Sequence, residues 1–130
     1  MVKLVQDLWI LSQSGKVLYQ RVFNVKMHAQ LFGALLSALT SFSKEISNTG
    51  LLNFQSSSFK FTLLKKEPLD FVATSDVKDN IKKVKAGLNK ISKIFFTKYE
   101  DILADWDNWD RNTDYFSDFK EDIKAYLKVL

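Results

Sequence analysis

The spacing of hydrophobic residues changes several times along the chain, and strand-like spacing comes first. The segments 4–11 and 17–23 are rich in β-branched, aromatic and aliphatic residues, and Gly15 lies in the short polar segment between them. Because glycine adopts the positive φ values that tight hairpins require, these segments are predicted to be two strands joined by a hairpin. The first segment is apolar on both faces, which is typical of a central strand that is covered on both sides.

Three further strand-like segments follow in the middle of the chain: 51–57, 58–66 and 69–75. In the second of them Phe59, Phe61 and Leu63 recur at every second position, which is the period of a β-strand. Pro68 separates the last two segments. It is predicted to lie in a turn, where its missing N–H costs nothing.

Helical spacing, with apolar residues at steps of three and four, occurs in three other parts of the chain. The segment 25–46 carries a leucine- and phenylalanine-rich stripe opposite a face of small residues, and Gly50 follows its end. A second helix is predicted from about 77 to 102, with Ser75 or Asp76 as its N-cap. A third is predicted from about Asp114 to the end of the chain.

This order of elements, β-β-α-β-β-β-α-α, predicts an α+β fold. A chain of 130 residues is expected to form a single domain, 1–130. The elements fit one five-stranded antiparallel sheet in the order 2-1-5-4-3 with helices packed against it. Such architectures are mostly interaction modules, so the pattern favours binding over catalysis.

The residues that usually carry out catalysis or hold metals are scarce. The chain has no cysteine and one histidine, His28, which leaves no thiol nucleophile and no multi-histidine metal site. Asp105, Asp107 and Asp110 superficially resemble a calcium loop. Tryptophans interrupt that series, and the glycine and the final glutamate of such a loop are missing. We therefore expect no enzyme activity, no cofactor and no metal site.

Charge is distributed unevenly in the second half of the chain. The segment 78–98 holds seven lysines and one acid, and 100–122 holds nine acids and two bases. The helical period predicts that lysines of the first segment share one exposed face; these are Lys82, Lys83, Lys85, Lys90 and Lys93. We expect the chain's own acids to neutralise this face, and an anionic membrane or an acidic partner are the alternatives. The face lacks arginine and has Phe96 as its single neighbouring aromatic, so nucleic acid is not expected.

Two other groups of residues are candidates for partner binding. The third strand is predicted at a sheet edge beside the first helix, where Phe32, Leu36, Leu52 and Phe54 would line an apolar site for an added strand or a docked helix. Simple core packing is the alternative for these four residues. Trp106 and Trp109 are interpreted as a lid over one end of the core, with a partner anchor as the alternative.

Several segments resemble the longin, or SNARE-like, domain family of membrane-trafficking proteins, whose fold is also described as profilin-like. The stretch 8–19, LWILSQSGKVLY, is similar to the family's opening pattern of an apolar strand, a glycine-containing turn and a Leu-Tyr pair. Further segments resemble the small longin-like subunits of the TRAPP complex: 34–44, 53–61 and 71–76. The small subunits of clathrin adaptors share this architecture. No SNARE heptad repeat follows the domain, and 105–112 matches no part of the family pattern.

The resemblance implies a non-catalytic adaptor or scaffold of membrane trafficking or small-GTPase regulation. Its expected partners are proteins, namely longin- or roadblock-type subunits or a small GTPase. A roadblock-type dimeric regulator of a small GTPase is the alternative, although that fold usually begins with a helix. A homodimer and peripheral contact with an anionic membrane are left open. The chain shows no signal-peptide pattern and no long apolar run, so a cytoplasmic location is expected.

Overall fold

The computed structural model describes residues 4–12, 16–21, 51–55, 59–110 and 112–127, with the backbone alone for 51–55 and Phe59. The strands are β1 (Asp7–Ser12), β2 (Val17–Arg21), β3 (Leu51–Gln55), β4 (Phe59–Lys66) and β5 (Leu69–Asp76). The helical elements are α2 (Ile81–Lys98), α3 (Glu100–Ala104), η2 (Trp106–Asn108), η3 (Thr113–Phe116), α4 (Phe119–Ile123) and η4 (Lys124–Tyr126). The predicted helix 25–46 lies outside the described residues.

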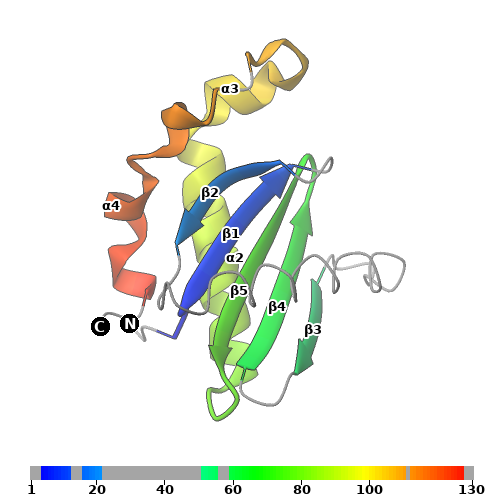
Figure 1. The fold of residues 1–130 in the computed structure, drawn as a ribbon, viewed down its shortest axis with the longest axis vertical. Helices are drawn as coiled ribbons and strands as arrows, with labels where there is room; N and C mark the ends of the chain where they lie inside the picture. Colours follow the sequence, from blue (N-terminus) through cyan, green and yellow to red (C-terminus); the bar gives the residue numbers. More distant parts are fainter. Residues whose placement is uncertain (1–3, 13–15, 22–50, 56–58, 111, 128–130) are drawn as a thin grey trace.

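The strands form one antiparallel sheet in the order β2-β1-β5-β4-β3, which agrees with the order predicted from the sequence (Figure 1). β1 and β5 pair from Asp7 opposite Thr74 to Ser12 opposite Leu69. All six residues of β1 are buried, as expected for a central strand covered on both faces. β4 and β5 are joined by the short turn at Glu67 and Pro68, where the sequence predicted it.

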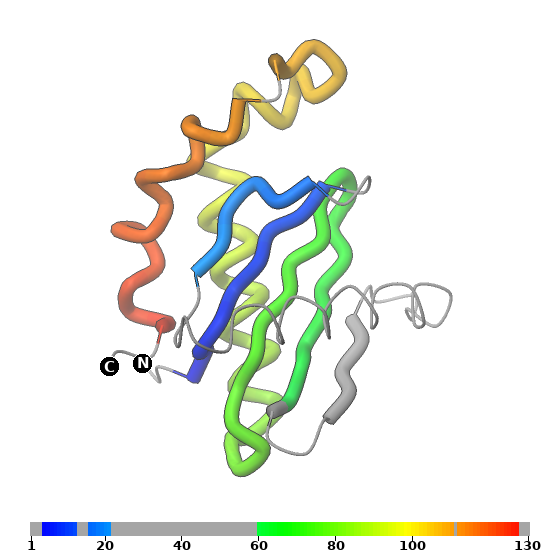
Figure 2. Tube along the Cα trace, in the orientation of Figure 1, coloured from blue at the N-terminus to red at the C-terminus, as the bar shows by residue number. Residues whose placement is uncertain are grey.

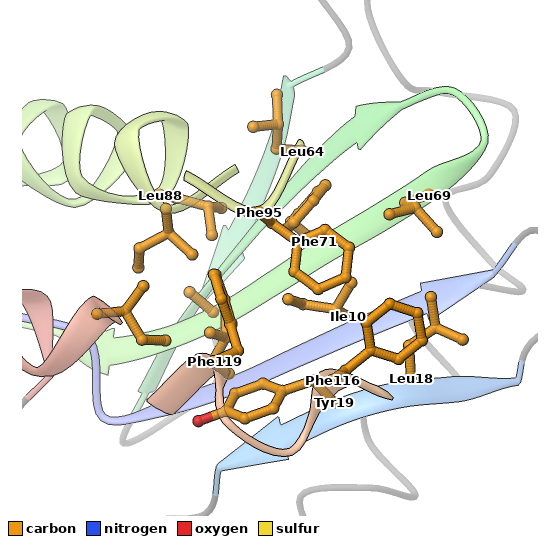
Figure 3. Close-up of a cluster of buried hydrophobic side chains, with 14 of the residues drawn as sticks. Ile10, Leu18, Tyr19, Leu64, Leu69, Phe71, Leu88, Phe95, Phe116 and Phe119 are labelled. Atoms are coloured by element: carbon orange, nitrogen blue, oxygen red, sulfur yellow. The ribbon is translucent and has the colours of Figure 1, made fainter. Parts of the chain in front are cut away.

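α2 runs along one face of the sheet, and η3, α4 and η4 lie beside it next to β2 (Figure 1). The core between these helical elements and the sheet is mainly aromatic and aliphatic (Figure 3). Phe95 is its hub, with ring centroids 5.9 Å from Phe71, 5.3 Å from Phe116 and 5.0 Å from Phe119. The C-terminal elements end beside the segment that precedes β1, where Val5 and Leu127 form an isolated parallel β-bridge.

The C-terminal part differs from the prediction of one continuous helix. The buried residues Phe116, Phe119, Ile123 and Leu127 do keep helical spacing. The backbone, however, forms η3, α4 and η4 in succession. Ser117 donates from its Oγ to the Asp114 carbonyl at 2.9 Å. Such local side-chain bonds compete with continuous helix and favour short turns. The stripe was therefore predicted correctly, and the helix boundaries were wrong.

Candidate interaction surfaces

α2 begins at a different cap from the one predicted. Asn80 is the N-cap, and its Oδ1 accepts from the backbone N–H of Lys82 at 2.9 Å and of Lys83 at 3.4 Å. The predicted caps, Ser75 and Asp76, belong instead to the end of β5. Because the sheet pairing continues to Asp76, the helix cannot start until the turn that follows it. This cap places lysines, rather than acids, in the first turn of α2.

One stripe of α2 is committed to the sheet, as the helical period predicted. Val84, Leu88, Ile91 and Phe95 are buried there. Residues spaced away from this stripe at about 100° per residue reach solvent. Four of the five predicted lysines are exposed and form what we call the lysine face: Lys82, Lys83, Lys90 and Lys93.

Lys85 departs from the prediction of one five-lysine stripe. It is only partly exposed and lies two helical turns before the buried Ser92, at the margin of the buried stripe. Phe96, the aromatic residue next to the predicted lysine face, is half-buried and packs against the core. Its ring centroid lies 5.9 Å from that of Phe71 and 5.9 Å from the Nζ of Lys66. Phe96 is therefore mainly a packing residue.

The C-terminal end of α2 is tied to the acidic segment by a small polar cluster. Lys98 donates from its Nζ to Asp122 at 2.5 Å and pairs with Asp118 at 3.2 Å. Tyr99 donates from its hydroxyl to Asp118 at 2.7 Å. The pKa of Asp118 is lowered, mainly by the hydrogen bond from Tyr99 and next by its contact with Lys98. The pKa of Tyr99 is raised, mainly by burial and next by the hydrogen bond to Asp118.

The expectation that the chain's own acids neutralise the lysine face is wrong for the described residues. α2 is paired with the acidic segment through Lys98, which contacts Asp118 and Asp122 and lies outside the lysine face. Within the described ranges, Lys82, Lys83, Lys90 and Lys93 make no ion pair. The physical reason is the position of η3 and α4, which pack against the last turns of α2 through Phe116 and Phe119 respectively.

The acidic segment forms a second surface beyond the C-terminus of α2, an open pocket of about 340 Å³. We call it the acidic pocket, and its lining is Asp101, Ile102, Asp105, Asn108, Trp109, Asp110 and Tyr115. The hydroxyl of Tyr115 donates to Asp110 at 3.2 Å, and this bond raises the pKa of Tyr115. Asn108 donates to Asp105 at 2.7 Å. Tyr115, with 48% of its surface exposed, is the large hydrophobic residue that reaches solvent here.

The tryptophans of this segment support the interpretation as a lid. Trp109 is buried and its ring centroid lies 5.7 Å from that of Phe116 in the core. Trp106 is half-buried and stacks on Trp109 at 4.9 Å. η2 thus closes the end of the helix layer that projects past the sheet, as the path of the chain shows (Figure 2). The tryptophan pair predicted a lid, but no local pattern predicted the pocket that Trp109 and Tyr115 line together with three aspartates.

The predicted edge strand is at the predicted place. β3 ends the strand order next to β4, with Leu52 opposite Leu63 and Phe54 opposite Phe61 in register. The side chains of Leu52 and Phe54, and the whole of Phe32 and Leu36, lie outside the described residues. The predicted apolar lining of this edge therefore stays a prediction.

Among the described residues, no group of three or more His, Asp or Glu side chains is placed to hold a metal ion. In the same described part of the chain, no helix is long and apolar enough to cross a bilayer. The described residues present two charged surfaces and one sheet edge.

A scan of protein-family models matches residues 6–101 to the first longin domain of FUZ, MON1 and HPS1. A search of curated proteins finds no match. The matched segment runs from just before β1 to the first turn of α3, so it includes the sheet and α2 and ends before most of the acidic pocket. The sheet with its helical layer on one face agrees with this match, which extends over more than half of the chain. The chain belongs to the longin domain family of FUZ, MON1 and HPS1.

Proposed function

We propose that this chain is a non-catalytic adaptor or scaffold of membrane trafficking that acts through protein–protein contacts. The single observation that carries the proposal is the family match over residues 6–101, which contains the whole sheet and α2. The proposed partner is a small GTPase or another longin- or roadblock-type subunit. The proposed location is cytoplasmic and peripheral to membranes.

The sheet edge at β3 is the proposed contact. A terminal strand carries backbone N–H and C=O groups that can pair with an added strand. The other edge, β2, is less accessible because the C-terminal elements lie beside it, with Tyr19 packed edge-on against Phe119 at 5.4 Å. Hydrogen bonding at β3 would supply affinity for a partner strand, and Leu52 and Phe54 are the proposed determinants of specificity.

The test uses the purified chain and a panel of small GTPases from its source organism, each nucleotide-free, with GDP and with a GTP analogue. We expect one of them to bind and to slow amide hydrogen exchange in β3. Exchange in β2 is the internal control and should stay unchanged. Absence of binding by every GTPase and every longin- or roadblock-type subunit of that organism would contradict the adaptor proposal. Binding that leaves β3 exchange unchanged would contradict the proposed edge.

The roadblock-type dimer makes a different prediction about oligomeric state. Its symmetric dimer would persist at all salt concentrations, because burial of apolar surface holds such interfaces together. The observation that favours the adaptor is the match of residues 6–101 to a longin domain. Size-exclusion chromatography with light scattering at high salt separates the two proposals, since the adaptor is expected to be monomeric there.

A further inference from the structure

The lysine face carries four positive charges on a helix whose other side is packed against the sheet. Its four lysines, Lys82, Lys83, Lys90 and Lys93, have no acidic partner in the part of the chain that the structure describes. Two of them lie in the first turn of α2, which contains no acid. Cations at a helix N-terminus lie beside the positive end of the helix dipole and are repelled by it, so this arrangement disfavours the isolated helix. Positions that break a local rule are often functional, so these lysines are candidates for a role in binding.

The acidic pocket is the matching feature at the opposite end of α2. Asp101, Asp105 and Asp110 line it together with the rings of Trp109 and Tyr115. None of these three aspartates pairs with a described lysine or arginine. A lysine side chain fits such a surface, because its aliphatic stem can lie on the aromatic rings while its ammonium reaches the carboxylates.

One molecule cannot bring the whole lysine face to its own pocket. α2 has 18 residues and is therefore about 27 Å long. Its first turn carries Lys82 and Lys83, and the pocket lies beyond its last turn, where α3 projects past the sheet (Figure 1). The side-chain charges separate along α2 in the same direction as the helix dipole and add to it. Among the described residues, Lys82 and Lys83 therefore lie at the N-terminal end of α2, and the three aspartates of the acidic pocket lie beyond its C-terminal end.

We propose that the lysine face of one copy of this chain binds the acidic pocket of a second copy, head to tail. This contact goes beyond the proposed adaptor function and does not depend on it. It uses two different surfaces, so it is heterologous and leaves a free surface at each end for further copies. Exposed ion pairs dominate it, so the association is reversible and weakens as salt increases.

Salt dependence is the first test. Sedimentation velocity of the wild-type chain over a range of protein concentrations should show concentration-dependent association at about 0.01 M salt, where the Debye length is about 30 Å. At about 1 M salt, where that length is about 3 Å, the chain should be monomeric. A monomer at every concentration in low salt would overturn the proposal. So would a dimer that persists in high salt, which is the behaviour of the roadblock-type alternative.

Two neutralised variants provide the decisive test. The first, K82Q/K83Q/K90Q/K93Q, keeps the pocket, and the second, D101N/D105N/D110N, keeps the lysine face. Each variant alone should remain monomeric in low salt. Mixed together they should form a one-to-one complex that cannot grow, because each supplies one intact surface. Association of either variant alone to the wild-type extent, or no complex in the mixture, would overturn the proposal.

A matched control separates the lysine face from net charge. The variant K16Q/K65Q/K120Q/K124Q removes the same number of charges from exposed lysines elsewhere. It should associate as the wild type does, and circular dichroism melts should show that all variants fold. Flotation with vesicles containing anionic lipid gives the competing outcome. If the wild-type chain stays monomeric, binds these vesicles and loses binding in the lysine-face variant, the face serves a membrane and the second-copy proposal is wrong.

Discussion

The two ends of α2 carry the same kind of residue in opposite circumstances. Lys98 in the last turn is held between Asp118 and Asp122, whereas Lys82 and Lys83 in the first turn have no acidic partner among the described residues. Both ends belong to one basic segment that an acidic segment follows. The difference shows that an acidic segment adjacent in sequence neutralises only those lysines that packing brings within reach.

Packing at the C-terminal end is dominated by aromatic residues. Phe95 and Tyr99 extend the buried stripe of α2, with ring centroids 4.7 Å apart. Phe116 contacts both of them, at 5.3 Å and 4.9 Å. Burial of these rings positions α4, and Asp118 and Asp122 then lie beside Lys98. The ion pairs follow from the aromatic packing, since exposed ion pairs are too weak to dock a helix.

The largest expected effect comes from removing the hub of this packing. Phe95→Ala leaves a cavity between α2, β5 and α4, and we expect it to lower the free energy of unfolding by about 3–5 kcal/mol. Urea denaturation monitored by tryptophan fluorescence measures this loss. Thr97→Ala, on the exposed side of the same helix, is the control and should change stability by less than about 0.5 kcal/mol. Equal effects of the two substitutions would contradict the hub role.

A smaller effect is expected from the hydroxyl that links the two segments. Tyr99→Phe keeps the buried ring and removes the hydrogen bond to Asp118, so we expect a loss of about 0.5–1.5 kcal/mol. The pKa of Asp118, measured by NMR titration, should rise toward its ordinary value. Tyr115→Phe removes a comparable bond to Asp110 at an exposed site and should cost less. An unchanged pKa of Asp118 in Tyr99→Phe would refute this link.

Acid should weaken the same end of α2. The folded-state pKa of Asp118 is lowered, so its contribution is complete above the unfolded-state pKa of about 3.9 and is lost as pH falls through the folded-state pKa. Asp118→Asn should therefore reduce the loss of stability on acidification below about pH 4. Denaturant titrations at a series of pH values measure this slope. Asp107→Asn, which replaces an exposed carboxyl without a described ion pair, is the matched control for the loss of one negative charge.

The smallest effect on stability is expected at the opposite end of α2. Replacing the four lysines of the lysine face with glutamine should change the free energy of unfolding by no more than about 0.5 kcal/mol per site. The sign should be a slight gain at low salt, because the positive end of the helix dipole repels lysines in the first turn. Thermal melts in low and high salt measure it. A marked loss of stability would show that the lysines are structural and would remove the contrast between the two ends.

The element order and the buried stripe of α2 were predictable because each depends on local period. Alternation of apolar residues located the strands, and spacing of three and four residues located the buried side of α2 from Val84 to Phe95. The burial of β1 on both faces also follows from its uninterrupted apolar residues. The resemblance of the stretch 8–19 to longin domains agreed with the family that the chain matches.

The candidate surfaces were predictable only in part. The helical period identified the exposed lysines of α2, but it did not separate Lys85 from the other four. It also did not indicate that Lys98, outside that set, would be the lysine that pairs with the acidic segment. The acidic pocket was missed because its residues come from α3, η2 and η3, whose relative positions no local pattern specifies. The cluster of Asp, Trp and Tyr residues over 101–115 was the available signal.

The sequence by itself determined which residues face the sheet, because the periods of strands and helices impose that choice on any chain with this pattern. Tertiary structure decided where helices stop and which charges meet. The turn at Tyr99 separates α2 from α3, and α4 lies against the end of α2, since Phe95, Phe116 and Phe119 bury one another there. These contacts join residues distant in sequence, so they depend on the packed core as a whole and on no local pattern.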